Sequence, residues 1–119
     1  MSRILALTVA AALLSITACS RTDEDIAQPP AITKEQALDL ASKGDCLICH
    51  RIEYKLVGPA WKDVAAKYRG NTNAVNTIAS HIQSGGSFGW KFGVMPPRGG
   101  STISDEEVAK LAGFIASLK

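Results

Sequence analysis

The chain has 119 residues, a length that suits one domain, and a formal net charge of +2. A charge so close to zero shows no sequence-wide bias toward nucleic acid or toward a strongly acidic partner. The three cysteines do not supply a disulfide framework, because two stand in one short motif and the third lies next to an apolar leader.

The first 18 residues have the layout of a secretory signal peptide. Arg3 precedes an almost unbroken apolar run, residues 4–18, which is shorter than the roughly 20 residues of a membrane span. The run ends Ile16-Thr17-Ala18-Cys19-Ser20, which resembles the box at which bacterial lipoproteins are cleaved and lipidated. We therefore expect lipidation of Cys19 and attachment to a membrane surface. Ordinary cleavage nearby, with an incidental cysteine, is the alternative.

Residues 19–32 are predicted to be a lipidated N-terminus followed by a flexible linker, because they are polar, lack a period and contain Pro29-Pro30. The domain proper is expected over residues 33–119. Its apolar residues recur at helical spacing and no segment alternates as a strand would, so the predicted fold class is all-α. Four helices are expected, beginning at the capping box Thr33 to Gln36, at Gly58-Pro59, at about Asn73 and at the second capping box Ser104 to Glu107.

Cys46-Leu47-Ile48-Cys49-His50 is the attachment motif of a c-type haem. Each sulfur adds to one vinyl group on the same edge of the porphyrin, and the next residue then places an imidazole under the iron. The motif therefore predicts one haem c held covalently through Cys46 and Cys49, with His50 as an iron ligand. Export fits this prediction, because bacteria attach haem to this motif outside the cytoplasmic membrane.

The same motif also occurs in zinc sites and in thioredoxin-type dithiols. A zinc site needs four ligands in a tetrahedron, and only Cys19 and His81 remain to complete one. A thioredoxin-type dithiol needs a βαβ setting, and nothing around the motif alternates as a strand. His81 lies off the apolar stripe of its expected helix, so we interpret it as a solvated side chain and not as a haem ligand.

The second face of the iron is open, bound by water or bound by the protein. After the leader the chain has one methionine, Met95, in an apolar loop rich in glycine, proline and aromatic residues. Pro96 and Pro97 restrict the backbone and so fix the direction of the Met95 thioether. A His/Met pair fills the iron's coordination sphere and raises its reduction potential, which suits an electron carrier.

Three motifs in this order resemble those of the small bacterial class I cytochromes c with a short methionine loop. They are the haem motif, Val57-Gly58-Pro59-Ala60-Trp61-Lys62-Asp63-Val64-Ala65, and Trp90 ahead of Met95-Pro96-Pro97, and the resemblance covers residues from about 34 to 119. It implies about four short helices wrapped around one covalent haem, with iron bound by His50 and Met95. It also implies that the Pro59 carbonyl accepts the other imidazole proton of His50, and that Trp90 hydrogen-bonds a haem propionate.

The chain departs from this pattern just before the methionine. Lys91-Phe92-Gly93-Val94 stands where the pattern is richer in proline, and Arg98-Gly99-Gly100 follows the prolines. Both changes predict a less stiff methionine loop.

The expected function is therefore that of a monomeric one-electron carrier, not an enzyme, in a periplasmic respiratory chain of a bacterium. Its expected donor is a quinol-oxidising complex, and its acceptor a terminal reductase, peroxidase or oxidase. Alternatives are a haem-bearing subunit of a larger oxidoreductase, and a ligand-binding or peroxidatic haem protein if Met95 is labile. Candidate partner contacts are the lysines Lys55, Lys62, Lys67 and Lys91.

Overall fold

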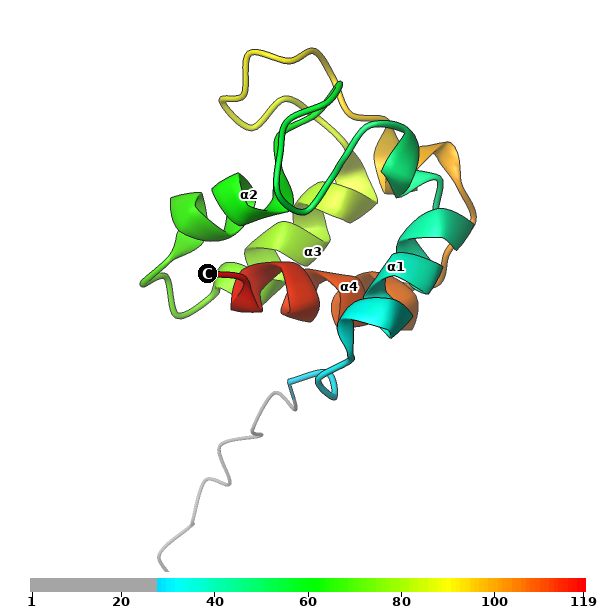
Figure 1. The fold of residues 1–119 in the computed structure, drawn as a ribbon, viewed down its shortest axis with the longest axis vertical. Coiled ribbons are helices and arrows are strands. Elements are labelled where there is room, and N and C mark those ends of the chain that lie inside the picture. Colours follow the sequence, from blue (N-terminus) through cyan, green and yellow to red (C-terminus); the bar gives the residue numbers. More distant parts are fainter. Residues whose placement is uncertain (1–27) are drawn as a thin grey trace, which may run out of the picture.

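The computed structural model describes residues 28–119 as a bundle of short helices (Figure 1). No strand occurs among these residues, so the predicted all-α fold is confirmed. The predicted signal peptide, Cys19 and most of the predicted linker lie outside the described residues. The helices in chain order are α1 (Lys34–Lys43), η1 (Cys46–Ile48), α2 (Trp61–Tyr68), α3 (Ala74–Ser84), η2 (Pro97–Gly100) and α4 (Asp105–Ser117), where η marks a 3₁₀ helix.

Both predicted capping boxes are present and begin α1 and α4. The Thr33 hydroxyl accepts from the Gln36 N–H at 3.2 Å, and the Gln36 side chain accepts from the Thr33 N–H at 2.8 Å. Ser104 and Glu107 repeat the exchange at 3.2 and 2.8 Å. Each box satisfies two backbone donors that a helix start otherwise leaves free, a cap that contributes about 1 kcal/mol.

The start of α2 differs from the prediction. The sequence predicts Pro59 near the first helical position, whereas the helix begins at Trp61. The first N–H groups of the helix, on Trp61 and Lys62, donate to the carbonyls of Arg51 and Ile52 at 2.9 and 3.1 Å. The loop that follows the haem motif thus caps α2. Pro59 lies ahead of the helix, and its carbonyl contacts the side chain of His50.

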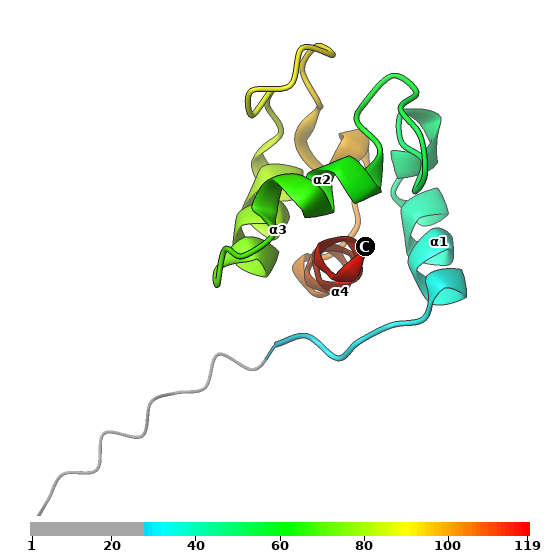
Figure 2. The ribbon, with the colours of Figure 1, turned by 60° about the vertical axis from the view of Figure 1, so that its left-hand side comes forward.

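The core lies where α4 packs against the other three α-helices. Figure 2 shows α4 end-on, with α1 on one side, α3 on the other and α2 across them. Ala37 and Ala41 of α1 are fully buried, and their small side chains let α1 approach α4 closely. Val108 and Leu111, the largest fully buried side chains, both belong to α4. This helix is therefore the support on which the rest of the domain is built.

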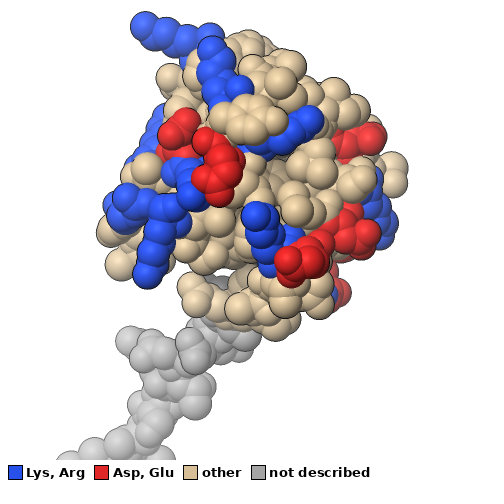
Figure 3. All heavy atoms as spheres, viewed as in Figure 1, with Lys and Arg blue, Asp and Glu red and all other residues tan. Residues whose placement is uncertain are grey.

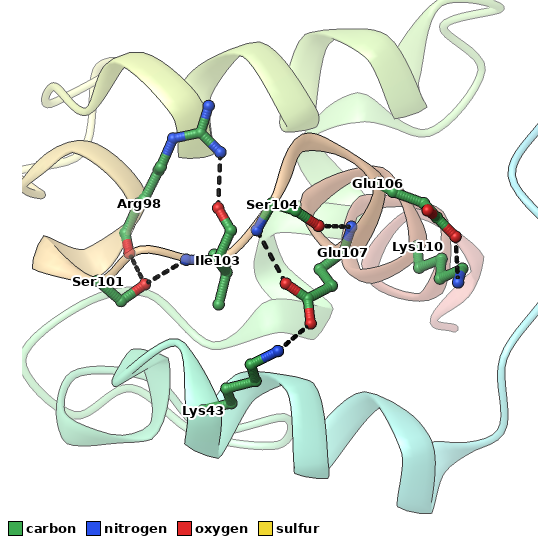
Figure 4. A network of polar contacts seen from close by, with 8 residues as sticks. All are labelled: Lys43, Arg98, Ser101, Ile103, Ser104, Glu106, Glu107 and Lys110. Atoms are coloured by element: carbon green, nitrogen blue, oxygen red, sulfur yellow. Dashed lines mark hydrogen bonds and ion pairs between the residues drawn. The ribbon is translucent and has the colours of Figure 1, made fainter.

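A polar network fastens the N-terminal end of α4 to its neighbours (Figure 4). The Lys43 ammonium, at the end of α1, pairs with the Glu107 carboxylate. Arg98 donates to the carbonyl of Ile103 at 2.8 Å and accepts a hydrogen bond from Ser101 at 2.7 Å through its own carbonyl. The network joins α1, η2 and the first turn of α4.

This network predicts a specific response to acid. The bond from Lys43, with that from the Ser104 N–H, lowers the pKa of Glu107 from its usual 4.5 to about 2. Because the folded-state pKa is the lower one, the stabilisation is fully present above pH 4.5 and is lost as the pH falls through about 2. Glu107→Gln keeps the capping geometry. As the pH is lowered from 4.5 to about 2, we expect the thermal unfolding midpoint of this variant to fall less steeply than that of the native protein. Glu106→Gln, in the same turn, is the control, and equal slopes for Glu107→Gln and the native protein would contradict the assignment.

Charges of both signs are interspersed on the face drawn in Figure 3, in keeping with the low net charge. Within residues 28–119, no helix combines the length and the apolar character that crossing a membrane requires.

Candidate haem site

An apolar cavity of about 1030 Å³, counted with its open mouth, lies between the segment 45–61 and the segment 86–96. Ile78 of α3 and Leu111 and Ile115 of α4 line it from the helical side. All of the predicted site residues that the structure describes line this cavity, namely Cys46, Cys49, His50, Pro59, Trp90 and Met95.

His50 is held firmly in one orientation. The residue is 9% exposed, and Nδ1 lies 2.8 Å from the carbonyl oxygen of Pro59. Because a carbonyl only accepts, the proton sits on Nδ1 and the lone pair of Nε2 is left for another partner. The Trp61 ring stacks at 6.2 Å, and burial lowers the pKa of His50, which keeps the imidazole neutral as a metal ligand requires.

The two thiols occupy one edge of the cavity, on and just after η1. The Cys46 carbonyl accepts hydrogen bonds from the N–H groups of Cys49 and His50 at 3.2 and 2.9 Å, which folds the motif into a tight turn. Cys46 is buried, and burial raises the pKa of its thiol. Arg51 donates to the carbonyls of Leu47 and His50 and closes the turn from outside.

Met95 approaches the cavity from the opposite segment. Its N–H and carbonyl pair with the carbonyl and N–H of Gly86 at 3.1 and 2.9 Å, so the residues on both sides of the loop are joined at its base. Gly85, next to this pair, has φ +65 and lies so close to the Met95 carbonyl that a Cβ would approach it to 2.5 Å. The backbone of Met95 is therefore fixed where α3 ends.

The structure corrects the interpretation of His81 as a solvated residue. The His81 ring is half-buried, lines the cavity and stacks on Phe88 with a centroid distance of 3.7 Å. The Tyr68 hydroxyl lies 3.3 Å from its Nδ1. Burial, with a smaller contribution from the Lys67 ammonium, lowers the pKa of His81. Helical periodicity could not predict these contacts, because they join α2, α3 and a loop. No local pattern in the sequence indicates them.

The residues present fit a c-type haem better than the alternatives. Two adjacent thiols, an oriented imidazole with a free nitrogen and apolar walls are what covalent attachment and iron ligation need. Among residues 28–119, no three Cys, His, Asp or Glu side chains are grouped to hold a metal ion, so these residues by themselves supply no zinc site. Four helices around such a cavity define a small c-type haem protein of the electron-carrier class.

Comparison with known proteins places the chain more narrowly. The model of the family described as cytochrome c matches residues 35–119. Cytochrome c-552 of Nitrosomonas europaea is 43% identical over 81 residues, covering 68% of this chain and 77% of the relative. Cytochrome c-551 of Azotobacter vinelandii is 38% identical over 85 residues, covering 71% of this chain and all of the relative.

Solved structures agree with this placement. The crystal structure of Nitrosomonas europaea cytochrome c552 superposes with a TM-score of 0.63 at 43% identity, over 69% of this chain and 99% of that one. A class 1 cytochrome from Sideroxydans lithotrophicus superposes with a TM-score of 0.59 at 27% identity, over 73% and 97%. The chain belongs to the cytochrome c family. It is a small class I c-type cytochrome with one haem attached through Cys46 and Cys49, and it is an electron carrier and not an enzyme.

Proposed function

We propose that this cytochrome carries single electrons in the periplasm of a bacterium, with its iron held between His50 and Met95. The observation that supports this most strongly is the pair of fixed residues on one cavity. His50 is oriented by the 2.8 Å contact with Pro59, and Met95 is anchored by its backbone pair with Gly86.

Each proposed ligand has a defined task. When bound, the haem supplies a reversible one-electron couple between ferric and ferrous iron. His50 donates the lone pair of Nε2, and the Pro59 carbonyl orients the ring and increases its basicity. The soft thioether of Met95 would bind the iron, favour its ferrous state and exclude water from it. Trp90 is proposed to donate its indole N–H to a haem propionate.

The mouth of the cavity is proposed as the docking surface for redox partners. Three apolar side chains near the haem motif and the two cavity segments are exposed, with fractions of 67% for Ile48, 57% for Val57 and 77% for Val94. An apolar rim of this kind supports brief contacts that bring two haem edges together, with little charge to be desolvated. The proposed donor is a quinol-oxidising complex and the acceptor a terminal reductase, peroxidase or oxidase.

The lysines offered above as partner contacts divide into two groups. Lys62 pairs with Glu53, and Lys55 and Lys67 lie over aromatic rings of the protein itself. Lys91 is exposed. The apolar rim is therefore a better candidate for the contact with redox partners than these four lysines.

Electron self-exchange between ferric and ferrous copies tests this surface with the protein as its own partner. Val94→Glu places two carboxylates face to face in each encounter, so the self-exchange rate measured by NMR line broadening is expected to fall about tenfold or more. Thr72→Glu adds the same charge in the exposed turn between α2 and α3 and is the control. Equal rates for the two variants would show that electrons do not leave through this rim.

Attachment to a membrane through lipidated Cys19 is also proposed. Leu111 and Ile115 of α4 line the cavity, whereas Gly113 and Ala116, on the other side of α4, line a second groove together with Gln28, Pro29 and Ala31. The N-terminal end of the domain thus lies on the face of α4 turned away from the cavity (Figure 1). A membrane tether at this end would leave the apolar rim of the cavity open to redox partners. Release of Cys19→Ser from the membrane fraction, with an unchanged haem spectrum, is the expected result, and an unchanged membrane fraction would exclude the lipid anchor.

A further inference from the structure

The loop that carries Met95 has little stiffness of its own. We call residues 86–95 the methionine loop. Its base is closed by the Gly86 and Met95 backbone pair, and its interior has one backbone hydrogen bond, from the Trp90 N–H to the Ser87 carbonyl at 2.8 Å. No proline restricts the ten residues, and glycines within them adopt positive φ. Contacts from outside the loop must therefore hold it against the domain.

Two lysines from other segments supply such contacts. Lys67 of α2 donates to the carbonyl of Phe88, and its ammonium lies 4.7 Å from the centroid of the Trp90 ring. Lys55 places its ammonium 4.4 Å from the centroid of the Phe92 ring. Trp90 and Phe92 stack on each other at 6.0 Å, with their planes 17° apart. The two cations thus contact two rings that also pack against each other.

These contacts join the two sides of the haem site. Lys55 lies in the same loop as Pro59, the residue whose carbonyl orients His50. Its contact with Phe92 therefore joins the loop that orients His50 to the methionine loop, which carries Met95. These are the two loops above the helices in Figure 1. The stack of Phe88 on His81 adds a third fixed point from α3.

We propose that Lys55 and Lys67 are positioning residues that hold the methionine loop closed and so keep Met95 on the iron. The inference rests on the proposed His/Met ligation and goes beyond it, because it identifies what holds residues 86–95 in place of proline within the loop. Each exposed cation–π contact is expected to favour the closed loop about twofold to fivefold. Loss of both is expected to raise the opening constant about fourfold to twenty-five-fold if the two contacts act additively.

Competition with free imidazole measures this opening directly. Imidazole reaches the ferric iron only when Met95 has left, so its apparent affinity rises in proportion to the open fraction. Ferric holoprotein is titrated at about pH 8.5, where the free imidazole probe is neutral. Binding is read as loss of the far-red sulfur-to-iron band. Lys55→Gln and Lys67→Gln are each expected to bind imidazole about twofold to fivefold more tightly than the native protein.

Two controls separate positioning from charge and from stability. Lys91→Gln removes the same charge from the loop itself, where the side chain is exposed, and is expected to leave imidazole affinity unchanged. Lys67→Arg keeps a cation over the ring and is expected to restore native affinity. Thermal unfolding of the helices, followed by far-UV circular dichroism, is recorded for every variant.

We call the contacts of Lys55 and Lys67 with the methionine loop the clasp. The outcomes of the titration distinguish failure of the clasp from failure of the ligation by Met95. If the native ferric protein lacks the sulfur-to-iron band, Met95 is not the ligand and the clasp falls with that assignment. If the band is present and all three Lys→Gln variants bind imidazole alike, the ligation stands and the clasp alone is wrong. Affinity changes that merely follow the unfolding temperature would likewise overturn the clasp.

Discussion

Met95→Leu is expected to convert the protein from a closed electron carrier to a haem protein with an open iron. Leucine preserves most of the apolar volume at the cavity wall, a swap that costs less than about 1.5 kcal/mol of folding free energy. It has no lone pair for iron, so the reduced variant is expected to bind carbon monoxide. The reduction potential is expected to fall by more than about 0.1 V, within the roughly 0.8 V range that axial ligands span.

The control for this substitution is retention of fold and attachment. Far-UV circular dichroism and the mass of the covalent adduct should match those of the native protein, because Cys46 and Cys49 are untouched. Carbon monoxide binding equal to that of the native protein, together with an unchanged potential, would contradict ligation by Met95.

Gly58→Ala is expected to damage the histidine side of the site. A Cβ on Gly58 would lie 2.6 Å from Cε1 of His50 and 3.0 Å from both ring nitrogens. The ring has no room to retreat, because it is held by the Pro59 carbonyl and packed against Trp61. Overpacking of this kind costs about 1–3 kcal/mol, which for a domain of this size lowers the thermal midpoint by roughly 5–20 °C.

Gly113→Ala is the matched control for Gly58→Ala. A Cβ at Gly113 meets only Pro29, at an ordinary 3.6 Å, and alanine is the better helix former inside α4. Its thermal midpoint is therefore expected to equal or exceed the native value, whereas Gly58→Ala is also expected to shift the haem absorption bands. A Gly58→Ala protein with native stability and spectrum would mean that His50 is free to move.

Features encoded within a few residues could be predicted from the sequence. Thr33 and Ser104 mark helix starts because their partners stand three positions away, and the haem motif needs five consecutive residues. The bounds of α2 could not be predicted in this way. Its first donors are satisfied by carbonyls ten residues earlier, on Arg51 and Ile52, so Pro59 is not needed as a helix opener.

The second part of the site depends on contacts between distant segments. His81 was interpreted as solvated because its position on α3 departs from the apolar stripe, yet Phe88 and Tyr68 cover it. The lysines Lys55 and Lys67 likewise resemble ordinary surface charges in the sequence, and only the fold brings aromatic rings under them. Periodicity within one helix carries no information about such partners.

Visible absorption of the purified, exported protein in its oxidised and reduced forms tests the ligation by His50 and Met95 most directly. Both proposed ligands line one cavity, His50 with Nε2 free and Met95 with its backbone fixed, so the iron is expected to be low-spin in both oxidation states. Ligation predicts sharp bands on reduction and a weak far-red sulfur-to-iron band in the oxidised form. A high-spin spectrum without that band would mean that Met95 does not bind the iron and that the protein is not a closed electron carrier.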